Sequence, residues 1–342
     1  MDKETSFFAS TILQKPATRG EGKIEKGVLL LSRCDYACAK IPELKKYFFL
    51  IEWRGWSGIS NQITPHIKLI DNPQELELAQ KLFPKIICLA IADADFVDTD
   101  EFRPLGIAKP YAALQISAWQ PFKRHELFVR AAALCPDRSF MKFGHFWNST
   151  NDKEAQKQQQ LRSDIIALDG SLGASIEFPF SKSIRNEDAP SNPEDINMII
   201  NKCRMGILTS NDEGVNRFKM ECLAADIPFL VAADASPTVK KHVNERTGML
   251  FPPTPRGLAD TIMWIDQHRD RFSPRKYVLK HSGKARSLAE LRKALSALAR
   301  REGYRCTYDT IYWDGRNSSF TWDEEKALED IRSAISELPT LK

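Results

Sequence analysis

Two glutamates eight positions apart, Glu213 and Glu221, have the spacing and surroundings in this chain that best suit ligand chemistry. The short apolar run at 205–209 that precedes them is typical of a buried strand. A helical pattern follows and stops at Pro228, and another apolar run begins at Phe229. Glu213 is therefore predicted at the carboxyl end of a strand, where open α/β sheets bind ligands. Glu221 is predicted on the next helix, whose start offers free N–H groups and a positive dipole end that suit phosphate.

The elements predicted around this pair alternate between strand and helix along most of the chain. Strands are predicted at 28–32, 48–53, 86–92, 112–118, 140–144, 174–178, 205–209, 229–233 and 247–251. Helices are predicted at 41–47, 73–82, 125–134, 152–168, 193–203 and 257–268, with a polar loop at 181–192. Such alternation implies parallel sheets. The acidic, Pro-containing stretch at 93–110 is expected to hold a domain junction.

The ordered motifs resemble the donor site of retaining glycosyltransferase family 4, the glycosyl transferases group 1. Glu213-Gly214, seven residues, Glu221 and then Pro228 follow the family's pattern. The segment TGMLFPP at 247–253 resembles the strand and turn that come next in that family. The segment at 116–133 resembles the strand, basic loop and helix that open its C-terminal domain. The resemblance extends over 111–265 and implies a GT-B fold, in which two Rossmann-like domains face each other across a cleft.

The resemblance also implies a domain organisation. Residues 1–105 would form a shortened N-terminal domain on the acceptor side, and 106–305 the domain that binds the nucleotide sugar. Residues 306–342 would form a helical tail that returns to the first domain. The sequence itself predicts only an amphipathic helix there, from the i, i+4 spacing of Ala327, Ile331 and Ile335.

The resemblance implies roles for three of these residues. Glu221 matches the glutamate that binds the ribose hydroxyls, and a carboxylate accepts two hydrogen bonds at once. Glu213 matches the residue that contacts the donor sugar, and Lys123 matches the lysine that binds phosphate. The substrate would be a nucleotide sugar such as a UDP- or GDP-sugar, with no metal or other cofactor. The plain alternative is that these are solvated charges on helix surfaces.

Backbone groups complete the donor site that the resemblance implies. The amides of Gly214, Val215 and Asn216 would approach the diphosphate, and Gly144 would be a strand-end glycine near the donor. Asn216 stands where the family usually has a second glycine, and an asparagine tolerates unusual backbone angles better than most residues. Asp226 likewise replaces a usual glycine at the end of the helix.

One departure concerns the basic residues. Ala118 stands where the family has a basic partner of Lys123, five residues earlier. Arg124 is the candidate to substitute for it, provided that the loop bends. The alternative for Lys123 and Arg124 is a solvated helix cap.

The first half of the chain carries fewer candidate residues. The family often has a histidine near the sugar, and His66 is the candidate here. Trp53, Arg54 and Trp56 form an aromatic and basic cluster that suits stacking on a sugar or base, with core packing of the tryptophans as the alternative.

Bulk properties exclude several classes of protein. A length of 342 residues predicts two domains. A formal net charge of +4 and the absence of any recognised motif argue against a nucleic-acid partner. The N-terminus has no apolar core of signal-peptide type, and no apolar run approaches a membrane span. With seven scattered cysteines, the chain is expected to hold free thiols in the cytoplasm. The basic stretch at 269–305 is either a solvated surface or a peripheral contact with the inner membrane surface.

Four hypotheses follow from these patterns. The leading one is a glycosyltransferase acting on an unidentified glycan, lipid-linked or polymer acceptor. The others are a nucleotide-sugar-binding protein that no longer catalyses, a scaffold subunit of a glycosylation complex, and another GT-B activity such as sugar epimerisation. The oligomeric state is not readable from the sequence.

Overall fold

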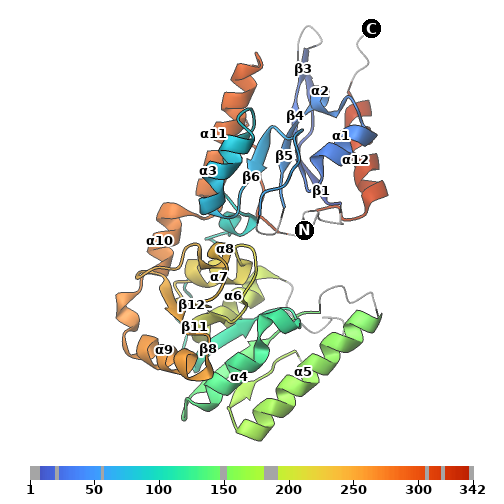
Figure 1. Cartoon of the computed structure of the whole chain (residues 1–342). Coiled ribbons are helices and arrows are strands. Elements are labelled where there is room, and N and C mark those ends of the chain that lie inside the picture. Colours follow the sequence, from blue (N-terminus) through green and yellow to red (C-terminus); the bar gives the residue numbers. More distant parts are fainter. Residues whose placement is uncertain are drawn as a thin grey trace. The chain divides into compact units, whose positions relative to one another are not determined.

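The computed structural model describes residues 8–19, 23–54, 58–146, 152–180, 192–304, 308–316 and 320–338. The chain divides into two compact units (Figure 1). The first unit combines Met1–Phe96 with Lys284–Lys342, and the second unit is Val97–Gly283. Each is an α/β unit built around a sheet that is wholly or mostly parallel. Of the predicted loop at 181–192, only Asn192 falls within the described residues.

The second unit holds a six-stranded sheet of order β10-β9-β8-β11-β12-β13. All its strands are parallel. They are β8 (Tyr111–Ile116), β9 (Ser139–Phe143), β10 (Ile176–Glu177), β11 (Cys203–Leu208), β12 (Phe229–Ala232) and β13 (Gly248–Phe251). In the sheet, β9 and β10 follow one another outward from β8, and β12 and β13 follow one another outward from β11 on the opposite side. The loops that leave β8 and β11 therefore diverge, which creates the switch point where such sheets bind ligands.

Capping side chains begin several helices of the second unit. They are α4 (His125–Ala133), α5 (Asp152–Leu172), α6 (Pro193–Asn201), α7 (Arg217–Ala224), α8 (Pro237–Lys240), α9 (Pro255–Gln267) and α10 (Pro274–His281). The side chains of Asn192, Asn216 and Thr254 cap the free N–H groups of α6, α7 and α9. After α7 the chain turns at Asp226, whose φ of 61° suits an aspartate better than most residues.

The first unit holds a five-stranded sheet of order β1-β4-β5-β6-β7. The strands are β1 (Ser10–Gln14), β4 (Gly27–Leu31), β5 (Phe48–Glu52), β6 (Ile67–Leu69) and β7 (Ile87–Leu89), and β2 (Ala17–Arg19) pairs with β3 (Lys23–Glu25) separately. The sequence predicted β4, β5 and β7 but no strand before residue 28. The structure adds β1, which pairs antiparallel with β4 at the sheet edge.

Helices cover both faces of the first sheet. They are α1 (Cys34–Lys40), α2 (Leu44–Tyr47), α3 (Pro73–Leu82), α11 (Lys284–Arg301) and α12 (Glu324–Ser336). One face of β4 and β5 packs against α11, and the opposite face packs against α1 and α12. The predicted second domain, 106–305, thus differs from the observed second unit at its end. The apolar stripe of α11, which includes Leu291 and Leu295, lies in the core of the first unit.

Candidate active site

An ion pair joins the loops that leave β8 and β11. The Nζ of Lys123 lies 2.5 Å from Oε1 of Glu213, and their side chains are only 12% and 8% exposed. Glu213 also accepts hydrogen bonds from the hydroxyl of Ser210 (2.5 Å) and from Nδ2 of Asn216 (2.6 Å). Three donors therefore orient one carboxylate at the switch point of the sheet. The structure brings together two of the residues that the sequence predicted, ninety positions apart.

Asn216 links this carboxylate to the start of α7. Its Oδ1 accepts a hydrogen bond from the backbone N–H of Lys219 (2.9 Å), and its Nδ2 donates to Glu213. One side chain thus caps the helix and braces the carboxylate. Asn216 therefore has two structural tasks in the turn before α7.

Replacing Asn216 with Ala is expected to destabilise the protein by about 1 kcal/mol, because an N-cap of α7 is lost. The brace of Glu213 is lost as well. Asn216→Asp is the matched control, since an aspartate caps a helix equally well but sets a like charge beside Glu213. Thermal unfolding measures the loss of the cap, and the affinity for a nucleotide sugar measures the loss of the brace. Equal affinities of wild type and Asn216→Asp would show that the brace is unimportant.

Glu221 lies on the second turn of α7. Its Oε1 accepts a hydrogen bond from Nε of Arg217 (3.0 Å), one helical turn earlier, and its side chain is 12% exposed. The carboxylate and the start of α7 thus belong to one short helix, which is the relation that the sequence predicted.

Arg124 does not supply a spare cation beside Lys123. The residue adopts a left-handed backbone conformation (φ 49°), so the loop bends, and its side chain reaches across two strands. Its Nε donates to the carbonyl of Thr209 (2.5 Å), and its two terminal nitrogens donate to the carboxylate of Asp234 (2.7 and 2.9 Å). These bonds hold the pKa of Asp234 below its usual value. Arg124 therefore ties together the loops after β8, β11 and β12.

Close backbone approach accounts for Gly144. A Cβ atom at this position would lie 2.1 Å from the carbonyl oxygen of Ser117, so only glycine fits where β9 ends beside the loop after β8. Ala118 is buried in the same loop. Among the predicted backbone contributors, Val215 has a buried side chain, and Gly214 is half-buried in the turn before α7.

Three further residues of this site escaped sequence reasoning: Thr209, Ser210 and Asp234. Thr209 and Ser210 are the first two residues after β11, and Asp234 comes two residues after β12. A polar residue just beyond a buried parallel strand was the available signal.

His66 occupies a packed position in the first unit. Its ring is 8% exposed and packs edge-on against Phe49, and its Nδ1 accepts a hydrogen bond from the backbone N–H of Leu50 (3.0 Å). Burial, followed by the charges of Lys45 and Lys26, lowers the pKa of His66 from 6.5 to about 3. These contacts give the ring a structural role in the sheet of the first unit.

The buried neutral ring predicts a loss of stability in acid. Between pH 6.5 and about 3, the unfolded imidazole binds a proton that the folded one does not. The contribution is full above pH 6.5 and is lost as the pH falls, by up to about 1.4 kcal/mol per pH unit. His66→Gln is expected to flatten the fall in thermal midpoint between pH 6.5 and 5, whereas His281→Gln, at an exposed position, is not. Parallel curves for wild type and His66→Gln would contradict this.

Of the predicted aromatic and basic cluster, Trp53 is a core residue. Trp53 is 3% exposed and stacks on Phe320, with ring centroids 4.4 Å apart, inside the core of the first unit. Trp56 lies outside the described residues. The stacking surface predicted for a sugar or base is therefore not formed by Trp53.

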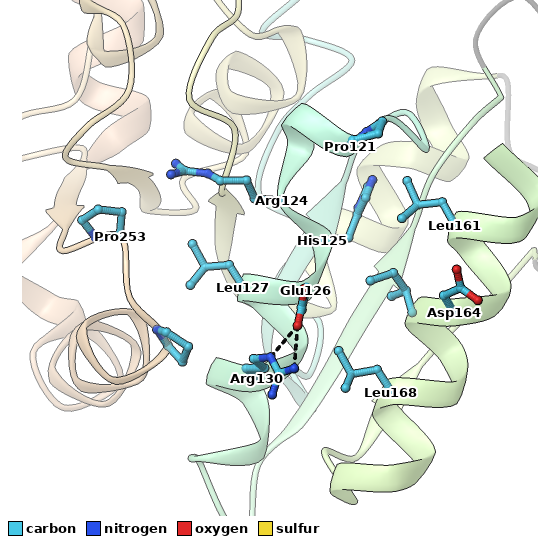
Figure 2. A pocket seen from close by; sticks show the side chains of 12 residues that line it. Pro121, Arg124, His125, Glu126, Leu127, Arg130, Leu161, Asp164, Leu168 and Pro253 are labelled. Carbon is cyan, nitrogen blue, oxygen red and sulfur yellow. Dashed lines mark hydrogen bonds and ion pairs between the residues drawn. The ribbon is translucent and has the colours of Figure 1, made fainter. Parts of the chain in front are cut away.

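A groove of about 790 Å³ runs beside α4 in the second unit (Figure 2), and Arg124 contributes to its lining. Its walls combine mostly polar and charged side chains of α4 with apolar side chains of α5 and with two prolines, one before α9 and one at its first residue. An ion pair between Glu126 and Arg130 lies at one side. Neither Lys123 nor Glu213 lines it. Over the described ranges, no three His, Cys, Asp or Glu side chains gather as a metal site. Every helix described is too short or too polar to span a bilayer.

Comparisons with known proteins identify the fold. Neither a family model nor a curated protein matches the chain. Among solved structures, sucrose-phosphate synthase from Thermosynechococcus elongatus is similar at 15% identity, with a TM-score of 0.57 over 75% of this chain and 70% of that one. Anabaena Alr3699/HepE in complex with UDP-glucose is similar at 13% identity, with a TM-score of 0.55 over 76% and 75%.

A third similar structure is the pneumococcal O-GlcNAc transferase GtfA in complex with UDP and GlcNAc. It has 12% identity and a TM-score of 0.54 over 75% of this chain and 54% of that one. Identities this low establish the fold alone. The chain has the α/β fold with parallel sheets found in GT-B glycosyltransferases, which confirms the predicted fold class.

Proposed function

We propose that this protein is a retaining glycosyltransferase of the family 4 type that uses a nucleoside diphosphate sugar. The observation that carries the proposal is the ion pair between Lys123 and Glu213 at the switch point of the sheet. Glu221 lies close by in the chain, on the helix α7 that follows the turn with Glu213. The acceptor would be a glycan, a lipid-linked sugar or a polymer. Neighbouring folds in complex with UDP, UDP-glucose or UDP and GlcNAc make UDP-sugars the first donors to test.

Each residue has a chemical task in this proposal. When the glycosidic bond of the donor breaks, negative charge develops on the diphosphate, and the Lys123 ammonium stabilises it. The free N–H groups at the start of α7 act in the same direction. The Glu213 carboxylate accepts hydrogen bonds from hydroxyls of the sugar, and Glu221 accepts them from the ribose. No bound metal is required, because the leaving group meets a cation and a helix start.

Donor binding would change the partner of Lys123. In the structure described here, its ammonium faces Glu213. A diphosphate would take over Lys123, and the sugar hydroxyls would then replace the ammonium as donors to Glu213. Ser210 and Asn216 would keep the carboxylate in place during this exchange, since their bonds to it are independent of Lys123.

Release of nucleoside diphosphate from UDP-glucose, UDP-GlcNAc, GDP-mannose and ADP-glucose tests this proposal. The wild type is expected to hydrolyse one donor slowly and to transfer its sugar when a suitable acceptor is added. Proton NMR of the product would then show the anomeric configuration of the donor. Glu213→Gln is expected to lose the activity. An inverted product would exclude the retaining mechanism.

A second function is favoured by Ala118 and by the engagement of Arg124 with Asp234. Both leave Lys123 without the neighbouring cation that the family uses. This second function would be the binding of nucleotide sugars without catalysis. It would bind the donor and release no nucleoside diphosphate, whereas an epimerase would isomerise the donor without an acceptor.

A further inference from the structure

A row of buried polar side chains crosses three adjacent strands directly behind Lys123. Lys142 on β9, Gln115 on β8 and Thr209 after β11 are all 0% exposed. Nζ of Lys142 donates to Oε1 of Gln115 (2.7 Å), and Nε2 of Gln115 donates to Oγ1 of Thr209 (2.7 Å). Oγ1 of Thr209 in turn donates to the backbone carbonyl of Lys123. The row thus ends on the residue proposed to meet the diphosphate.

Lys142 has an unusual environment for a lysine. Its other polar neighbour is Nδ1 of His125 (2.7 Å), and the ring of Trp119 lies 4.7 Å from its nitrogen. Neither partner supplies a negative charge: Gln115 is an amide, and burial, followed by the charge of Lys142, lowers the pKa of His125 well below its usual value. Burial also lowers the pKa of Lys142 well below its usual value. Burial of an unpaired charge is costly, so the neutral amine is favoured. Such a group serves as a hydrogen-bond donor rather than as a counterion.

The direction of each bond follows from the one before it. With Oε1 of Gln115 facing the amine, its NH₂ group faces Thr209 and donates to Oγ1. A hydroxyl that accepts one bond still has its own hydrogen to donate. That hydrogen goes to the carbonyl of Lys123. The carbonyl of Thr209 also accepts from Nε of Arg124 (2.5 Å), so both basic residues of the loop are held at one strand end.

We propose that Lys142, Gln115 and Thr209 form a buried relay of positioning residues that sets the backbone of Lys123 and so aims its ammonium at the diphosphate. This inference rests on the proposed function. A lysine side chain loses rotamer freedom when it binds a ligand. A backbone that is already held in one conformation leaves less conformational freedom to lose when the diphosphate binds. The relay would act on phosphate recognition and leave recognition of the ribose and base to Glu221 and other elements.

Thr209→Val and Thr209→Ser form a matched pair that tests the relay. Valine keeps the shape of threonine and loses the hydroxyl, whereas serine keeps the hydroxyl. Calorimetry would give dissociation constants for the nucleoside diphosphate that the wild type binds (UDP, GDP or ADP) and for the corresponding nucleoside. Thr209→Val is expected to weaken the diphosphate about tenfold and the nucleoside less than twofold. Thr209→Ser is expected to bind both like the wild type.

Three results would overturn the relay. Equal affinities of Thr209→Val and Thr209→Ser for the diphosphate would do so. Equal weakening of diphosphate and nucleoside would show a general structural role instead. A wild type that binds none of the nucleoside diphosphates would reject the proposed function and the relay with it, so the two failures are distinguishable. If Thr209→Val does not fold, Gln115→Glu replaces it, because this change keeps the size of the side chain and removes the donor to Thr209.

Discussion

Lys123→Met is expected to lower kcat/KM for sugar transfer by a factor of about one hundred to one thousand. Methionine keeps most of the length of the side chain and removes the charge that stabilises the departing diphosphate. Losing one preorganised electrostatic group at a developing negative charge typically costs this much. Nucleoside diphosphate release at saturating and limiting donor would measure it, with the thermal midpoint as a check on folding.

The control for this prediction is Lys153→Met. Lys153 is exposed on α5 in the same unit, so its removal changes the net charge equally and touches no part of the site. It is expected to leave kcat/KM within twofold of wild type. Should Lys123→Met retain activity within threefold of wild type, the role of Lys123 at the diphosphate would be rejected.

Glu221→Ala is expected to weaken nucleoside diphosphate binding roughly ten- to hundredfold. A hydrogen bond to a charged group contributes about 1.5–3 kcal/mol, and each 1.4 kcal/mol is a factor of ten in affinity. The reason is specific to the ribose. The wild type is therefore expected to prefer a ribonucleotide to its 2′-deoxy form, and Glu221→Ala is expected to lose that preference. Calorimetric titration of wild type and Glu221→Ala with both nucleotides measures these four affinities.

Arg217→Met separates loss of the carboxylate from loss of its ion pair. This variant removes the 3.0 Å contact with Glu221 but keeps the carboxylate. It is expected to keep the preference for the ribonucleotide. A Glu221→Ala protein that still distinguishes the two nucleotides would place the ribose elsewhere.

Much of the second unit could be predicted because its signals are local. A proline and a capping side chain begin each of α6 and α9, and Pro228 marks the limit of the segment that contains α7. The pairing of β8 with β11 could not be predicted in this way, because β9, β10 and the helices α4, α5 and α6 lie between the two strands in the chain. No residue pattern in either segment identifies the strand with which it pairs. The meeting of Lys123 and Glu213 depends on that pairing.

Other features depend on contacts distant in the sequence. The edge strand β1 carries no strong local pattern and exists because β4 offers it a partner. The apolar stripe of α11 predicts a helix that packs against a core, but it does not predict which unit that core belongs to. The pair of Arg124 and Asp234 is 110 positions apart. The sequence shows that Arg124 is charged, but its pairing with Asp234 depends on the bend of the loop at Arg124.

The central claim is that the second unit binds a nucleoside diphosphate at the switch point between β8 and β11. Thermal unfolding of wild type and Glu221→Ala with UDP, GDP and ADP tests it most directly. A ligand at about one hundred times its dissociation constant adds roughly 2.7 kcal/mol of stability. We predict that at least one nucleotide raises the midpoint of the wild type and that Glu221→Ala loses about half of the shift or more. No shift with any of the three, or an undiminished shift in the variant, would contradict the account.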